Sequence, residues 1–264
     1  MRVSSIATLM LAVLGGGCVG NTGGETFTFP VAAAGPADAA AGQPLVFTSS
    51  GFTVTLTQAS LHVGAVYLNQ SAPVSGAQAT GCYLTATYVG EETSPLDVDL
   101  LNPTPQIFPA AALGVTEPAV KAEQVWLTGG DINTLADSTV ILAIAGSATG
   151  TTGTFPFTGQ VTIGANHAPA GTSTGGGDAI CRQRIVTPIQ QPITLRRTGG
   201  LLLRIDPRAL FVGVDFSQLP PDPASGGYAF SNDPAAPGYS PTGQYLYGNL
   251  RSIGPYQFSW SEDL

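Results

Sequence analysis

Positively charged side chains are scarce in this chain of 264 residues. It has one lysine, Lys121, and eight arginines, and charged residues of both signs make up only 10% of the total. Acidic residues outnumber basic ones, so the formal net charge is −8. Proteins that bind nucleic acids need a basic surface that neutralises phosphates. The composition therefore excludes nucleic acid as a partner.

Motifs for catalysis and nucleotide binding are also lacking. Lys121 follows Val120 rather than a glycine run, which excludes a phosphate-binding loop there. Residues 171–175 match G-x-S-x-G, but no helix is expected after them, and hydrolases need a strand–turn–helix at this motif. His167 also precedes the serine, against the order in α/β-hydrolases. We therefore expect a protein that is not an enzyme.

The apolar run near the amino terminus is short. Arg2 precedes the nine residues Ile6–Leu14, whereas a membrane-spanning helix needs about 20. Three glycines and Cys18 follow, and this order resembles a bacterial lipoprotein signal, in which the cysteine receives acyl chains such as palmitate. The pattern predicts a signal peptide over residues 1–17 and lipidation of Cys18. The alternative is an ordinary signal peptide cut elsewhere, with Cys18 a free thiol.

Cysteine is rare, and its count is odd. The three cysteines are Cys18, Cys82 and Cys181. An exported protein with an unpaired cysteine calls for an explanation, and lipidation of Cys18 provides one. Cys82 and Cys181 are then predicted to form a disulfide in an oxidising compartment; two buried free thiols are the alternative.

The residue after Cys18 bears on which membrane holds the protein. Val19 is not the aspartate that retains many lipoproteins at the inner membrane, which favours the outer membrane, on either its periplasmic or its surface side.

The segment after the signal resembles a tether. Residues 18–44 are predicted to be a lipidated tether, because eleven of the fourteen residues in 31–44 are Ala, Gly or Pro. That composition does not bury a core. Within the tether, Thr26–Pro30 alternates threonine with phenylalanine, which is compatible with a first strand.

From Leu45 to the end the chain has the pattern of an all-β domain. Apolar and polar residues alternate with period two, β-branched and aromatic residues are frequent, and glycine-rich turns separate the runs. We predict a single antiparallel β-sandwich over residues 45–264, with ten or more strands and long Gly/Pro-rich loops; a barrel is the alternative. One helical turn is expected at Pro207–Phe211, capped by Asp206. The predicted strands lie near residues 52–57, 61–68, 82–89, 96–100, 123–127, 139–145, 155–163, 180–186, 192–195, 201–205 and 256–260.

Candidate binding residues lie in a long segment, Ser217–Tyr245, which is predicted to be a loop. It has six prolines and four glycines in 29 residues, together with Tyr228, Tyr239 and Tyr245. Tyrosine rings offer apolar area with a polar tip, which suits stacking on sugars or contact with a protein. We expect at least two of the three to be exposed on one side of the domain and to bind a protein or glycan partner. The alternative is that they pin the loop to the sandwich.

Histidine is the last scarce residue. His62 and His167 are the only two, and imidazole is a common ligand of copper and zinc. Both are candidate metal ligands, although a metal site usually needs further donors; a half-buried structural histidine is the alternative for His62. Asp97 and Asp99 share one face of a strand. They are expected to be its solvated side.

Four stretches are similar to uncharacterised predicted lipoproteins of Gram-negative bacteria: residues 61–69, 96–101, 125–131 and 256–260. The strand around His62 and the Asp-Leu-Leu run also resemble, more distantly, the methanobactin-associated (MbnP-like) periplasmic copper-binding domain. That family uses histidines and an oxidised tryptophan at its copper site and has more cysteines than this chain. The resemblance implies a copper ligand at His62 alone.

These observations favour one function and leave one alternative. We expect a non-enzymatic, lipid-anchored β-sandwich of the cell envelope that serves binding, adhesion or envelope organisation and needs no cofactor. The alternative is a periplasmic copper-binding protein that uses His62.

Overall fold

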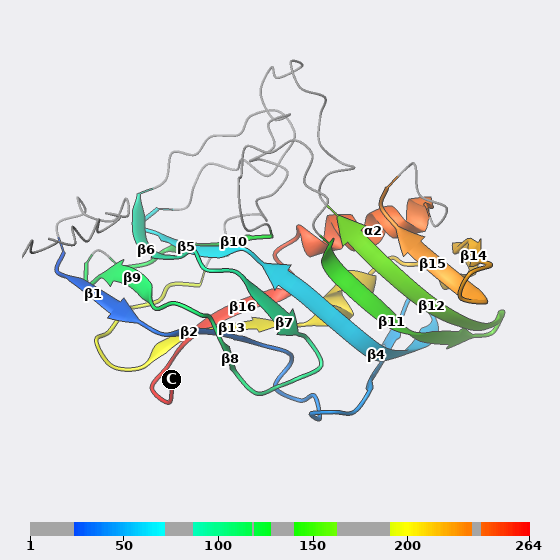
Figure 1. The fold of residues 1–264 in the computed structure, drawn as a ribbon, viewed down its shortest axis with the longest axis horizontal. Helices are drawn as coiled ribbons and strands as arrows, with labels where there is room; N and C mark the ends of the chain where they lie inside the picture. Colours follow the sequence, from blue (N-terminus) through cyan, green and yellow to red (C-terminus); the bar gives the residue numbers. More distant parts are fainter. Residues whose placement is uncertain (1–23, 72–86, 118, 128–139, 163–190, 234–238) are drawn as a thin grey trace, which may run out of the picture.

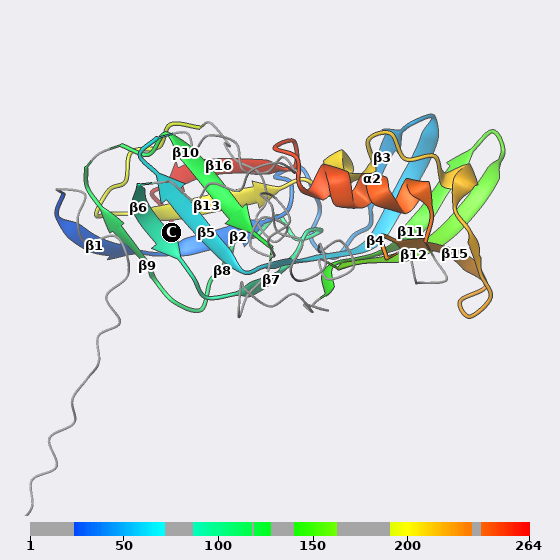
Figure 2. The same ribbon diagram turned by 90° about the horizontal axis from the view of Figure 1, so that it is seen from above.

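The computed structural model of the chain describes residues 24–71, 87–117, 119–127, 140–162, 191–233 and 239–264. In this part β-strands predominate, and the one α-helix is α2 (Pro241–Leu250). The molecule is elongated, with a large sheet and α2 at one end and two smaller sheets at the other (Figures 1 and 2). The helices of the described ranges are too short to cross a membrane.

Strand β4 (Phe52–Val63) organises the large sheet. Its apolar residues Phe52, Val54 and Leu56 are buried and alternate with threonines on the other face. One edge of β4 pairs with β11, and the other pairs first with β3 and then with β7. The remaining order places β12, β15 and β14 beyond β11. These strands are β3 (Leu45–Ser49), β7 (Leu96–Asp99), β11 (Val140–Gly150), β12 (Gly153–Thr162), β14 (Pro221–Asp222) and β15 (Gly227–Ser231).

Two smaller sheets form the opposite end of the molecule (Figure 1). The five-stranded sheet has the order β1-β9-β6-β5-β10, and the four-stranded sheet has the order β16-β13-β2-β8. They contact each other where the rings of Phe29 and Trp260 lie 5.3 Å apart. Their strands are β1 (Thr26–Phe29), β2 (Val31–Ala34), β5 (Ala65–Asn69), β6 (Tyr88–Glu92), β8 (Gln106–Ile107), β9 (Ala112–Val115), β10 (Ala122–Trp126), β13 (Gly200–Ile205) and β16 (Tyr256–Ser261).

The all-β class is confirmed, but a single antiparallel sandwich is wrong. The described residues form three sheets, and two of them contain a parallel pair, β2 with β13 and β12 with β15. Parallel neighbours need a long crossover connection, and here the pairs join segments far apart in sequence. Local alternation of residues therefore predicts the strands without predicting their partners.

The predicted tether also contributes to the fold. Every residue of β2 is buried, with Val31 and Ala33 facing the main core and Ala32 and Ala34 facing Leu202 of β13. A run of alanines lacks the alternation of apolar and polar residues that marks a strand with one solvated face. Its small side chains let neighbouring parts of the fold cover both faces of β2. The first four of the fourteen residues whose composition indicated a tether thus form a central strand.

The predicted loop Ser217–Tyr245 contains β14, β15 and the first half of α2 in its described residues. The expected turn at Pro207–Phe211 is confirmed as the 3-10 helix η2, and the Asp206 carboxylate accepts the backbone N–H of Arg208. A second 3-10 helix, η3 (Phe216–Gln218), follows. These short helices and α2 cover one face of the large sheet (Figure 2).

An aromatic cluster joins the sheet to these helices. Phe157 of β12 and Phe230 of β15 meet Phe211 of η2 and Phe216 of η3, with ring centroids 5.3 to 6.3 Å apart. Tilted and edge-on contacts of this kind add stability beyond the area that they bury. The cluster thereby joins η2 and β15, the two elements that α2 contacts.

Candidate functional site

The sequence-predicted residues divide into two groups. Cys18, Cys82, Cys181 and His167 lie outside the described residues, and this applies to the lipidation site and to the disulfide. The others, His62 and the three tyrosines of 217–245, lie within them.

His62 forms a specific contact across two strands. It stands opposite Asp97 in the β4–β7 pairing, and its Nδ1 lies 2.6 Å from Oδ1 of that carboxylate. The imidazole is mostly covered, with 18% of the side chain exposed, while Asp97 is 77% exposed. Since an ionised carboxylate only accepts hydrogen bonds, Nδ1 donates and Nε2 of a neutral ring keeps its lone pair. This is how carboxylates orient histidines that ligate metals.

The contact does not extend to a metal centre. In the part of the chain that the structure covers, no three His, Cys, Asp or Glu side chains gather closely enough to hold an ion. Asp99 is exposed on the same side of β7 as Asp97, as expected for a solvated face. Copper at His62 would therefore need donors beyond the described residues.

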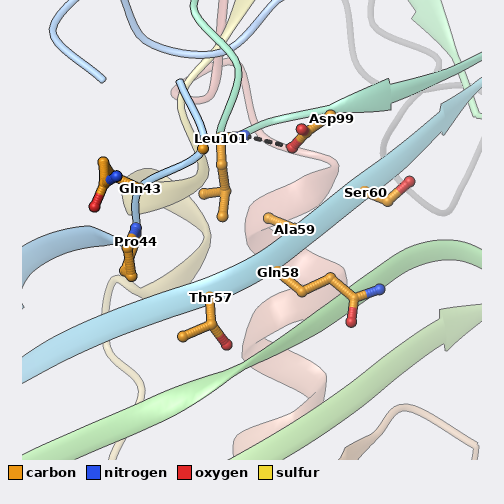
Figure 3. A pocket seen from close by; sticks show the side chains of 9 residues that line it. Gln43, Pro44, Thr57, Gln58, Ala59, Ser60, Asp99 and Leu101 are labelled. Carbon is orange, nitrogen blue, oxygen red and sulfur yellow. Dashed lines mark hydrogen bonds between the residues drawn. The ribbon is translucent and has the colours of Figure 1, made fainter. Parts of the chain in front are cut away.

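Asp99 instead orders the turn after β7. Its Oδ1 accepts the backbone N–H of Leu101 at 2.9 Å (Figure 3). The Gln106 side-chain amide accepts the N–H of Asp99 and donates to the carbonyl of Asp99. A shallow pocket of about 360 Å³ opens here between the turn, β4 and the segment before β3. The one carboxylate that lines the pocket belongs to Asp99, and it already accepts a backbone hydrogen bond. We therefore regard the pocket as part of the turn and not as a binding site.

Two of the three tyrosines are exposed and lie together. Tyr239 is 39% exposed and Tyr245 is 51% exposed, and both line one groove of about 380 Å³. Tyr228 differs: it is half-buried, with its ring 5.2 Å from that of Phe155. The expectation of exposure holds for Tyr239 and Tyr245, while Tyr228 helps to hold β15 on the sheet. We call the groove the α2 surface; it is lined by Tyr239, Pro241, Gln244, Tyr245, Gly248 and Asn249.

Backbone contacts hold the α2 surface in place. Ser240 caps the helix, with its Oγ accepting the N–H of Gly243 at 3.2 Å, and Pro241 occupies the first turn, where no donor is missed. Tyr239 is bridged to Ser231 of β15. The ring of Tyr245 lies over Gly213, where an added Cβ would come within 3.6 Å of it.

The two side-chain amides of the α2 surface, those of Gln244 and Asn249, donate hydrogen bonds to other parts of the fold. The Asn249 Nδ2 donates to the carbonyls of Leu210 and Val212, both at 2.8 Å, and the Gln244 Nε2 donates to the carbonyl of Asn232 at 2.9 Å. These bonds tie α2 to η2 and to the end of β15. Neither amide is predicted from the sequence, because Gln244 in the predicted loop and Asn249 just after it carry no signal until the helix is known.

A buried carboxylate lies in the five-stranded sheet. Glu123 of β10 has no exposed surface; its Oε1 finds no hydrogen-bond partner among the described residues, and its Oε2 accepts the N–H of Gln191 at 3.3 Å. Loss of water raises the pKa of Glu123 to about 8, although the Gln191 N–H acts in the opposite direction. The side chain is therefore held largely protonated at neutral pH.

Comparisons with known proteins give little beyond this geometry. No protein-family model matches the sequence, and no curated protein matches it. Among solved structures, MbnP from Methylosinus trichosporium aligns over 90% of this chain and 99% of its own, with 13% sequence identity and a TM-score of 0.37. A TM-score this low assigns neither a site residue nor an activity to the chain.

Proposed function

We propose that this chain is a non-enzymatic binding protein of the cell envelope, anchored by lipid at Cys18, and that the α2 surface is where it binds. The observation that carries the proposal is the pair of exposed rings, Tyr239 and Tyr245, in one groove. Exposed tyrosines are enriched at binding hot spots, and few rotamers are frozen when they are covered.

The rigidity of the α2 surface supports the same role. Its backbone is fixed by the Ser240 cap, by the Asn249 bonds to η2 and by the contacts of α2 with β15. A preformed surface loses little conformational entropy when it binds, so more of the contact energy remains as affinity. Concave sites with an apolar lining and a few polar groups are the usual form of ligand sites.

Retention on envelope material tests the proposal. The assay uses full-length protein with Cys18→Ser, which removes the lipid anchor, and envelope fragments of the bacterium that makes the protein. We expect the fragments to retain this protein, and Tyr239→Ala with Tyr245→Ala to weaken retention by at least about tenfold, or 1.4 kcal/mol. Val46→Ala, at an apolar residue 60% exposed on β3, is the control. Equal retention of the double variant and the control would refute the role of the α2 surface.

A second function, periplasmic copper binding through His62, is favoured by one observation. The Asp97 carboxylate orients the imidazole and leaves Nε2 available as a ligand. Copper analysis of purified protein distinguishes the two functions. Stoichiometric copper that is lost in His62→Asn would establish the copper function, whereas copper-free protein that binds envelope through its tyrosines would support the first.

A further inference from the structure

We infer that the α2 surface binds a neutral saccharide, an inference that rests on the proposed function and names the class of its ligand. The charge of the surface, the polarity of its hydrogen-bonding groups and its shape all favour such a ligand.

Formal charge is missing from the α2 surface. Its six lining residues include no Asp, Glu, Lys, Arg or His, and neither does the whole of α2, Pro241–Leu250. Solvent-facing sides of helices ordinarily carry charged residues, so a helix with none on either side is unusual. A cationic ligand would find no carboxylate here and an anionic ligand no basic group. The charge pattern therefore selects an uncharged ligand.

The polar groups of the surface are mainly acceptors. Asn249 uses both N–H bonds of its amide on the carbonyls of Leu210 and Val212, and Gln244 uses one on Asn232. Each amide retains its side-chain oxygen, and an amide oxygen accepts two hydrogen bonds. Tyr239 and Tyr245 add phenol groups, which both donate and accept. A ligand that matches this set presents O–H donors.

The apolar part of the surface consists of rings. Tyr245 rests over Gly213, and half of its side chain remains open to solvent. Together with Pro241 and the bare backbone of Gly248, it forms a platform without branched aliphatic side chains. A pyranose has an apolar face of C–H groups and a rim of hydroxyls, and aromatic rings with polar tips complement both.

The size of the groove separates a small ligand from a macromolecule. Its volume, about 380 Å³, lies within the range of small-molecule sites. A stable protein–protein interface buries roughly 800 Å² on each partner, which would have to extend well past the groove. A second copy of the chain or another protein is thus an outcome that the experiment has to detect.

Isothermal titration with defined hexasaccharides tests the inference on the full-length Cys18→Ser protein. The neutral probes are maltohexaose, cellohexaose and chitohexaose, which differ in linkage and substitution, and hexagalacturonate is the anionic probe of equal length. We expect at least one neutral probe to bind and hexagalacturonate to bind at least about tenfold more weakly. Tyr245→Ala should weaken the binding by about tenfold or more, Tyr245→Phe should keep it within a few-fold because the ring remains, and Val46→Ala should leave it unchanged.

The outcomes separate failure of this inference from failure of the proposed function. If no neutral probe binds, or if Tyr245→Ala binds like the wild type, the saccharide inference is wrong. If the envelope retention described above depends on the tyrosines but is not competed by any neutral probe, the inference is wrong and the proposed function stands. Concentration-dependent dimerisation abolished by Tyr245→Ala would show that a second copy occupies the surface. A loss in Tyr245→Phe equal to that in Tyr245→Ala would refute stacking.

Discussion

At the scale of single residues, burial of Glu123 makes the stability of the fold fall as the pH rises through the acidic and neutral range. Its pKa is raised from 4.5 in the unfolded chain to about 8 in the fold, because the carboxylate is buried with one oxygen unpartnered. The unfolded state therefore releases this proton above about pH 4.5, while the folded state keeps it until about pH 8. Over that interval the unfolded state binds fewer protons, and the free energy of unfolding falls as the pH rises.

Glu123→Gln should remove this pH dependence. The amide keeps an oxygen for the N–H of Gln191 and carries no charge, so at pH 7.5 the variant should be more stable than the wild type by on the order of 3 kcal/mol. At pH 5, where Glu123 is protonated in the folded protein, the two should be nearly equal. Thermal unfolding between pH 5 and 8.5 measures the difference. The control is Glu25→Gln, at an exposed carboxylate paired with Arg197. Parallel curves for wild type and Glu123→Gln would contradict the assignment.

At the scale of elements, we expect replacement by alanine to have opposite effects on stability at the two glycines of α2, Gly243 and Gly248. A Cβ at Gly243 would lie 2.2 Å from the carbonyl oxygen of Ser231, so an alanine has to push α2 away from β15. A Cβ at Gly248 would meet nothing within 4 Å. Gly243→Ala should destabilise the fold by about 1–3 kcal/mol through overpacking. Gly248→Ala should stabilise it by up to about 1 kcal/mol through helix propensity.

Denaturant unfolding of the two alanine variants measures these values, and each serves as the control for the other. The same atoms are added to the same helix, so a difference reports the contact with β15. If both variants were stabilised, the close packing of α2 on the strand would be disproved. Gly243→Ala should also shift Tyr239 and Tyr245 relative to each other, and it should weaken binding at the α2 surface.

Elements of this fold differ in how far their sequence predicts them. β4 is predictable because Phe52, Val54 and Leu56 are separated by threonines and only one face is buried. α2 is not, because two glycines and two tyrosines give it low helix propensity and no charged face. Its one signal was the pair Ser240–Pro241, the cap and first residue of a helix. The tyrosines of the α2 surface could thus be singled out, but not the amides that the helix places beside them.

At the scale of the whole molecule, the sheets are assembled by pairing of strands that are far apart in the sequence, and local residue patterns do not predict these pairs. The parallel partners β2 and β13 are separated by about 170 residues, and β12 meets β15 only after a crossover of more than 60. Period-two alternation is the same in parallel and antiparallel strands that bury one face. It therefore predicts where strands occur, but not how many sheets they form. For the same reason it does not predict at which end of the molecule α2 lies.

Attachment to the envelope, as proposed above, also belongs to this scale. A formal charge of −8 gives no electrostatic attraction to anionic lipid, and the described helices are too short to span a bilayer. We propose that membrane attachment depends on acyl chains at Cys18; two or more such chains hold a protein firmly, while one holds it weakly. Cys18→Ser should move the protein from the membrane to the soluble fraction, whereas the wild type should stay with membranes through a wash in 1 M salt. Cys82→Ser is the matched control; it removes the predicted disulfide with Cys181 and should leave attachment intact. If Cys18→Ser sedimented with membranes like the wild type, attachment would have to come from a protein partner instead.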